Sequence, residues 1–273
     1  MGKRTHTDME NSQAPAASSP FLPMFEQFRA ELDEHHDRRE RIIKASRDIT
    51  AASKKIIFTL QRTRRLNEPL PQNIAKGNEP YYKNIAAQFA SVSNDLQGLN
   101  AHRYSRQITG GCQEWMEAVS FEHYLTTASL ITFEDAAIKL RGLDQNGSGI
   151  ALTIEDYLLG IFDMTGELMR FAITTMAMNG KLPEITSAPD TAESSSEDTR
   201  SILHDMRALR SALEALNARG GPLGKDVDKK MEVMRASVEK VERALYGLVV
   251  RGAERPQGWL PDTEPSRAVE VEG

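Results

Sequence analysis

Two pairs of acidic residues stand in stretches that are otherwise largely apolar. Glu114 and Glu117 are three residues apart, and Asp163 and Glu167 are four residues apart, so each pair shares one face of a helix. Carboxylate oxygens are the ligands that Mg²⁺ prefers. Mg²⁺ held in this way activates a water molecule for phosphodiester hydrolysis. If the two faces meet, these four residues form a catalytic centre that holds one or two Mg²⁺ ions.

The segment 156–174 shows why these acids need a counter-charge. On a helical wheel its acidic residues fall on one side, and apolar side chains fill most of the remaining circumference. A helix of this kind is buried, and a buried carboxylate is costly unless a cation or hydrogen bonds compensate it. Residues 107–138 contain no Lys or Arg, so Arg170 is the only nearby cation visible in the sequence.

Two other interpretations compete with a magnesium site. Acidic pairs at this spacing are common and often structural, and Glu167 could simply pair with Arg170. A di-iron carboxylate bundle needs Glu-x-x-His on two helices. None of the six histidines has a glutamate three residues before it, which excludes that class of site.

A second candidate for chemistry is the basic segment 38–65. It contains ten Lys or Arg and two acidic residues, an excess of eight positive charges on a chain of net charge −5. Such an excess favours polyanion binding, although a solvated helix face would look the same. No motif for base-specific readout is present, so binding along the backbone of single-stranded nucleic acid fits better. The candidate nucleic-acid-binding residues are Arg38, Arg41, Lys44, Arg47, Lys54 and Lys55.

The elements that must position these residues are helices. Long proline-free stretches, 24–68 and 81–182, leave room for them. The spacing of apolar residues predicts seven helices, and no stretch shows sustained strand alternation, so the fold class is all-α. The predicted helices cover about 20–66, 72–98, 101–128, 132–142, 153–179, 201–219 and 225–250.

The same patterns divide the chain into one domain with two tails. We expect a disordered tail over 1–20, a single helical domain over 21–252, and an irregular tail over 253–273. Within the domain, the Ser-, Pro- and acid-rich segment 180–200 is predicted to be a mobile loop. Apolar residues repeat every three or four positions over 227–248, a seam typical of lengthwise packing, either inside the bundle or between subunits.

Composition excludes several classes of protein. The 273 residues carry a net charge of −5, which excludes a uniformly basic nucleic-acid binder but not a local basic patch. The single cysteine, Cys112, cannot form a disulfide within the chain and is typical of a reducing compartment. No run of about 18 apolar residues occurs, so we expect no membrane partner. The N-terminus lacks the features of a secretory signal.

Four segments resemble the translin family: HDRRERIIKASRDITAASKKIIFTLQR, ITGGCQEWMEAVSFEHYL, DYLLGIFDMTGELMR and KVERALYGLVVRGAERP. They occur in order and cover roughly 24–179 and 225–257. Within the family they look like the X-type subunit rather than translin itself. The resemblance implies a curved seven-helix bundle of long antiparallel helices. It also implies a closed hetero-octamer with translin subunits, located in the cytoplasm and the nucleus.

The resemblance also implies an activity. The family's assembly binds single-stranded RNA and DNA and cleaves RNA with Mg²⁺, in passenger-strand removal during RNA silencing or in tRNA-precursor processing. By motif match the X-type metal ligands are Glu114 and Glu117 of QEWMEAVSF, with Asp163 and Glu167 of DMTGELMR. We therefore expect a Mg²⁺-dependent endoribonuclease subunit. The alternative is a non-catalytic, nucleic-acid-binding scaffold whose carboxylates are purely structural.

Overall fold

The computed structural model describes residues 19–144, 147, 149–185, 200–216 and 221–251. Most of the predicted tail 1–20, most of the predicted loop 180–200, and the tail 253–273 lie outside these residues. The chain divides into two compact units, Met1–Arg41 and Ile42–Gly273. The single domain expected over 21–252 stays a prediction.

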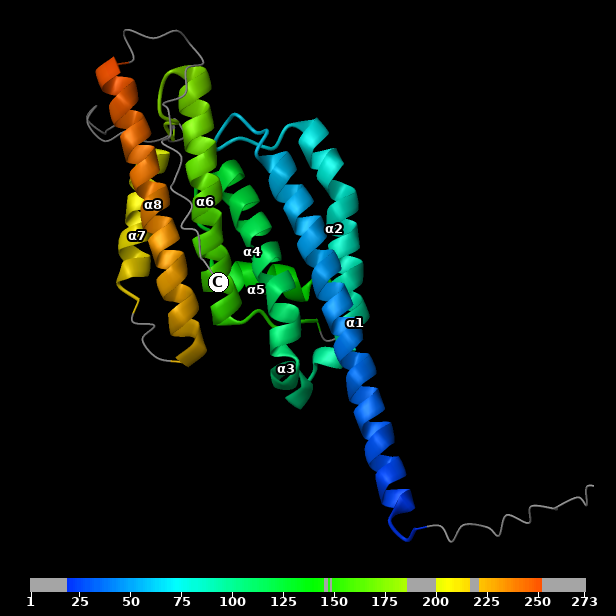
Figure 1. The fold of residues 1–273 in the computed structure, drawn as a ribbon. Helices are drawn as coiled ribbons and strands as arrows, with labels where there is room; N and C mark the ends of the chain where they lie inside the picture. The colour runs from blue at the N-terminus through cyan, green and yellow to red at the C-terminus, as the bar shows by residue number, and fades with distance from the viewer. Residues whose placement is uncertain (1–18, 145–146, 148, 186–199, 217–220, 252–273) are drawn as a thin grey trace, which may run out of the picture. The chain divides into compact units, whose positions relative to one another are not determined.

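The described residues form eight α-helices and one 3₁₀ helix (Figure 1). No strand occurs in this part of the chain, apart from an isolated bridge between Glu184 and Ser201, so the all-α class is confirmed. None of the described helices is long and apolar enough to cross a membrane. The elements are α1 (Leu22–Leu60), α2 (Gln72–Val92), η1 (Asn94–Leu96), α3 (Leu99–Arg103), α4 (Ser105–Thr127), α5 (Phe133–Arg141), α6 (Ile154–Asn179), α7 (Ile202–Glu214) and α8 (Gly221–Arg251).

The prediction of seven helices is wrong for the described residues, because the helix expected over 101–128 is two helices. Tyr104 separates α3 from α4 with a non-helical backbone, φ −108° and ψ 11°. Its side chain is buried in the core. The helix expected over 72–98 ends earlier, at Val92, and Gly98 turns the chain with a positive φ of 56°. The apolar residues keep a helical spacing across both of these points, so the sequence pattern does not reveal them.

The described part of the first unit is the N-terminal portion of α1. Ion pairs one turn apart support this helix, with Arg38 2.7 Å from Glu34 and Arg29 3.8 Å from Asp33. The apolar side chains of the helix and of Phe21 just before it are exposed: Phe21, Leu22, Met24, Phe25, Phe28 and Leu32. Local pairing therefore accompanies helix formation here, without burial of an apolar face.

In the second unit, α4, α6 and α8 lie side by side (Figure 1), with α6 packed against both of its neighbours. The core between the helices is built from large fully buried side chains such as Trp115, Phe89 and Phe121. The seam predicted over 227–248 faces inward. Its members Val227, Met231, Met234, Val238 and Val241 are buried, so the seam is an internal bundle contact.

Two glycines allow helices to approach closely around the acidic residues. A Cβ atom placed on Gly160 of α6 would lie 2.7 Å from Cβ of Met116 and 3.0 Å from the carbonyl oxygen of Gln113, both on α4. A Cβ atom on Gly111 of α4 would lie 3.1 Å from the carbonyl oxygen of Ser46 on α1. A side chain at Gly160 would therefore force a local shift, whereas one at Gly111 would require its neighbour to give by a smaller amount.

Candidate functional site

The two acidic pairs lie on the neighbouring helices α4 and α6 and share one electrostatic environment. Glu114 and Glu117 extend from α4, and Asp163 and Glu167 extend from α6. Burial, together with the negative charges of the other three carboxylates, raises the pKa of Glu117 to about 8. Burial also raises the pKa of Glu114, against the opposing effect of a nearby lysine. Four carboxylates are therefore concentrated at one place.

Two lysines from distant parts of the sequence partly balance this charge. The Nζ atom of Lys54 on α1 lies 3.8 Å from Oε2 of Glu114. Lys230 on α8 forms an ion pair with Asp163. Sequence reasoning missed Lys230 altogether and placed Lys54 only among the nucleic-acid candidates. Contacts spanning 60 residues or more leave no local pattern from which they could have been read.

Glu167 is held by two further side chains. Its carboxylate accepts a hydrogen bond of 2.7 Å from the amide Nε2 of Gln61, and a guanidinium nitrogen of Arg170 lies 3.6 Å from its other oxygen. The expected Glu167–Arg170 pair is thus present, but its length makes the Gln61 contact the stronger one. Gln61 follows the end of α1, so Glu167 links α6 to α1.

Glu117 differs from the other three acids. Within the described part of the chain its carboxyl group has neither an ion pair nor a side-chain hydrogen bond. Three cations, Lys54, Lys230 and Arg170, contact the other three acids. Glu117 therefore has no ion pair of its own among the described residues. Its pKa is raised first by burial and then by the three neighbouring carboxylates, against the weaker opposing effect of Lys230.

The four acids have the donor atoms that a magnesium ion needs, but their side chains are not arranged around a common point. As the side chains lie, no group of three or more His, Cys, Asp or Glu residues in the described part is arranged to hold a metal ion. Oxygens of Glu114, Asp163 and Glu167 face lysine, arginine or amide nitrogens instead. The donors are hard carboxyl oxygens, which Mg²⁺ prefers. The raised pKa of Glu117 means that its carboxyl keeps a proton near pH 7, and a bound Mg²⁺ would replace that proton. The predicted metal site stays a prediction.

Asp156, the first acidic residue on the acidic side of the segment 156–174, has a structural role. It is 5% exposed, and Thr109 and Gln113 of α4 both donate hydrogen bonds to its Oδ1 atom. Its own backbone N–H is capped by the hydroxyl of Thr153 at 3.0 Å. Asp156 therefore joins the start of α6 to α4 and sets the position from which Asp163 and Glu167 follow.

The six basic candidates divide between the two units. Arg38 and Arg41 belong to the first unit, whereas Lys44, Arg47, Lys54 and Lys55 are exposed residues of the second. Lys54 is directed to Glu114, and the ammonium of Lys55 lies 5.3 Å from the ring centroid of Tyr81. The nucleic-acid role of these six residues stays a prediction.

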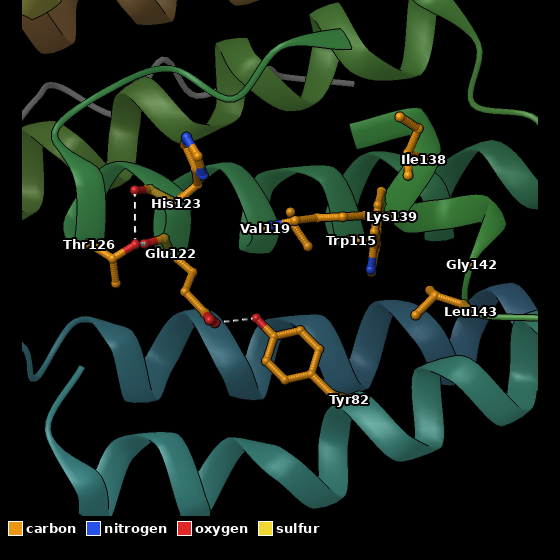
Figure 2. Close-up of a pocket in the computed structure, with 10 residues that line it drawn as sticks. All are labelled: Tyr82, Trp115, Val119, Glu122, His123, Thr126, Ile138, Lys139, Gly142 and Leu143. Atoms are coloured by element: carbon orange, nitrogen blue, oxygen red, sulfur yellow. Dashed lines mark hydrogen bonds between the residues drawn. The ribbon is translucent and has the colours of Figure 1, made fainter. Parts of the chain in front are cut away.

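A cavity of about 350 Å³ lies on another face of α4, and none of the four acids lines it. Figure 2 shows Glu122 extending from α4 toward Tyr82 of α2, whose hydroxyl donates a hydrogen bond to it. Trp115, His123 and Lys139 also line this cavity. Burial and the Lys139 ammonium lower the pKa of His123, which keeps its ring neutral at pH 7. The acid here is already satisfied by a neutral donor.

Sequence comparison matches the Translin family over residues 37–252. Translin-associated protein X of Rattus norvegicus is 33% identical over 95% of this chain and 91% of its own length. The Translin-associated protein X homolog of Schizosaccharomyces pombe is 31% identical over 85% of this chain and 89% of its own length. Translin of Homo sapiens is 23% identical over 84% and 92%, respectively.

Structural comparison agrees on the fold. The structure of the AfC3PO–duplex RNA complex matches with a TM-score of 0.58 and 18% identity, over 85% of this chain and all of that chain. Crystalline apo-NeC3PO matches with a TM-score of 0.53 and 15% identity, over 84% of this chain. At these identities the likeness concerns the fold alone. The family match and the sequence relatives together show that this chain belongs to the translin family.

Proposed function

We propose that this chain is the Mg²⁺-dependent endoribonuclease subunit of a translin-type hetero-oligomer that binds and cleaves single-stranded RNA. The observation that carries the proposal is the position of Glu117, which has no ion pair within the described residues and lies beside three other acidic side chains. The relatives named Translin-associated protein X support the X-type assignment. A structure of the same fold is a complex with duplex RNA, which supports RNA as the class of ligand.

The residues of the chain have distinct parts in this activity. Glu114 and Glu117 of α4, with Asp163 and Glu167 of α6, would hold the ion. When bound, Mg²⁺ supplies activation of a water molecule and neutralisation of charge on a phosphate. Gln61 orients Glu167 through its 2.7 Å hydrogen bond. Lys54 and Lys230 reduce the repulsion that a phosphate meets on approaching four carboxylates.

Binding of the strand would use charge rather than base readout. Lys44, Arg47, Lys54 and Lys55 are exposed in the second unit and can attract a polyanion, RNA or single-stranded DNA. The chain as a whole is acidic, at net charge −5, so translin subunits would complete the basic surface in a hetero-octamer. Passenger-strand removal and tRNA-precursor processing, in the cytoplasm and nucleus, are the roles we propose for it.

Metal removal tests this function directly. The chain is purified together with translin, and cleavage of a labelled single-stranded RNA is followed with Mg²⁺, with EDTA, and with Mg²⁺ restored after EDTA. We expect cleavage with Mg²⁺, none with EDTA, and recovery on restoration. Equal cleavage with and without EDTA would contradict a role for the metal.

A second function is favoured by a specific observation. In the described part of the chain three of the four carboxylates already have cationic or amide partners, and no three-ligand group is formed. That arrangement suits a non-catalytic, nucleic-acid-binding scaffold for translin. Such a scaffold binds the labelled RNA in the same experiment but leaves it intact under all three conditions.

A further inference from the structure

A cavity of about 250 Å³ lies in the second unit where the end of α1 meets α6. We name it the arginine pocket. Its lining residues are Phe58, Gln61, Arg62, Arg64, Arg170, Phe171 and Thr174. It is smaller than the usual range for drug-sized ligands, roughly 300–1,000 Å³, and suits a small group such as a phosphate.

The charge of this pocket is one-sided. Three of its seven lining residues are arginines, and none is acidic. Within the described residues Arg62 has no ion pair, and its guanidinium carbon lies 5.1 Å from the ring centroid of Phe58. Guanidinium groups without carboxylates in a concave site are typical of phosphate recognition, because their planar fork matches two phosphate oxygens.

The other two arginines differ in how they are held. Arg64 donates from Nη1 to the backbone carbonyl oxygens of Gln61 at 2.7 Å and Thr63 at 3.1 Å, so its head is fixed without a carboxylate. Arg170 is the one lining arginine with an acidic contact, at 3.6 Å from Glu167. The pocket therefore keeps a surplus of positive charge.

The walls of the pocket offer an apolar surface beside these charges. Phe58 is 58% exposed, whereas Phe171, which also lines the pocket, is buried. An exposed aromatic ring next to arginines is the combination by which single-stranded nucleic acid is held, since bases stack on the ring while phosphates contact the cations. Phe58 is thus an exposed aromatic residue that already carries a guanidinium over its ring.

The arginine pocket adjoins the four-carboxylate site. Two of its lining residues, Gln61 and Arg170, also contact Glu167. A strand whose scissile bond lies over the carboxylates therefore passes next to the pocket. This contiguity links the two sites through shared side chains.

We propose that the arginine pocket binds one backbone phosphate of a single-stranded RNA next to the bond at the carboxylate site, with the neighbouring base packed on Phe58. This inference rests on the nucleic-acid substrate of the proposed function. It adds Arg62 and Phe58 as residues that set the register of the strand. Arg64 completes the positive wall.

The test measures RNA binding without cleavage. The chain co-purified with translin is titrated with a labelled single-stranded RNA in EDTA at several salt concentrations. For Arg62→Gln we expect about 3- to 10-fold weaker binding. We also expect the slope of log K against log salt to fall by about 0.7, the value for one phosphate contact on a single strand.

Two further variants make the result specific. Arg65→Gln is the matched control, since Arg65 lies outside the pocket and pairs with Glu68 at 3.2 Å; it should bind as the parent does. Phe58→Leu should weaken binding while leaving the salt slope unchanged, because it removes stacking and no charge. Arg62→Lys should keep the slope and recover part of the affinity.

The experiment distinguishes a failure of the pocket proposal from a failure of the proposed nuclease function. An unchanged affinity and slope for Arg62→Gln, or an equal loss for Arg65→Gln, would overturn the pocket even in an active enzyme. A reduced slope confined to Arg62→Gln supports the pocket even if the complex cleaves no RNA, because EDTA excludes cleavage from the measurement.

Discussion

Two faces of α4 carry the same residue type in opposite circumstances. Glu117 and Glu122 are five residues apart, which turns them about 140° from each other around the helix. Glu117 lies beside the acids of α6 and, among the residues that the structure describes, makes no ion pair. Glu122 faces α2 and accepts a hydrogen bond from Tyr82. The difference comes from the opposing element and not from the glutamates themselves.

The two faces also differ in which group holds the proton. At the first face, burial and three carboxylates raise the pKa of Glu117 to about 8. At the second face the pKa of Tyr82 is raised well above its usual value, by burial first and by Glu122 next. The phenol therefore keeps its proton and donates a hydrogen bond to Glu122. One face needs a proton or a cation to balance it, while the other is already satisfied. That contrast explains why only the first is a candidate metal site.

The largest expected effect is on RNA cleavage, which a substitution on one face of α4 should abolish and the same substitution on the other face should spare. Glu117→Gln should lower Mg²⁺-dependent RNA cleavage by at least about 10³-fold, because the ion's several kcal/mol of transition-state stabilisation is lost with a ligand. Glu122→Gln, on the same helix, still accepts the Tyr82 hydrogen bond and should cleave within about two-fold of the parent. Both are measured as initial rates of the complex with translin.

RNA affinity in EDTA controls for binding in that experiment and should be nearly unchanged in both variants. Equal rates for Glu117→Gln and the parent would remove Glu117 from the catalytic centre. Equal losses in the two variants would show that α4 is disturbed as a whole.

The next effect concerns the approach of the helices that brings the acids together. Gly160→Ala places a Cβ atom 2.7 Å from Met116, whereas Gly166→Ala, on the same helix, meets nothing within 4 Å. Both variants gain the same helix propensity, so their difference isolates the close contact. We expect Gly160→Ala to be less stable than Gly166→Ala by up to about 3 kcal/mol in chemical unfolding.

We also expect Gly160→Ala to cleave RNA more slowly than Gly166→Ala. Asp163 and Glu167 follow Gly160 on α6, so a shift of the helix at Gly160 moves both acids. Indistinguishable unfolding of the two glycine variants would mean that the α4–α6 spacing is not limited at Gly160.

The smallest effect is a pH dependence of stability. The pKa of Glu117 is about 8 in the folded chain, against an ordinary value of 4.5. Between these values the folded state keeps a proton that the unfolded chain releases, so the free energy of unfolding falls as the pH rises. In EDTA we expect Glu117→Gln to exceed the parent by about 1–2 kcal/mol near pH 9 and to equal it near pH 5, after a discount for access of water.

Unfolding curves of the metal-free complex at the two pH values measure this difference. Glu122→Gln is again the control, and its pH profile should run parallel to that of the parent. A Glu117→Gln profile that also runs parallel would show that Glu117 carries no raised pKa in solution.

Much of the helical fold was predictable from apolar spacing. The predicted helices 132–142 and 153–179 agree with α5 and α6 within two residues at each end. Glycine usually weakens a helix, yet Gly110 and Gly111 both lie inside α4, where Gly111 lets α1 approach at Ser46. The true break, at Tyr104, has no glycine or proline to mark it. Local patterns predict helices well and their breaks poorly, because burial against other helices decides the breaks.

The sequence by itself determined that four carboxylates stand on the polar faces of two otherwise apolar helices, since that follows from helical periodicity alone. Only the tertiary structure decided what surrounds them. Lys54, Lys230 and Gln61 reach the site from α1, α8 and the turn after α1. The arginine pocket likewise exists only where the end of α1 meets α6. Electrostatic partnership depends on distance in space, and the order of residues along the chain does not encode that distance.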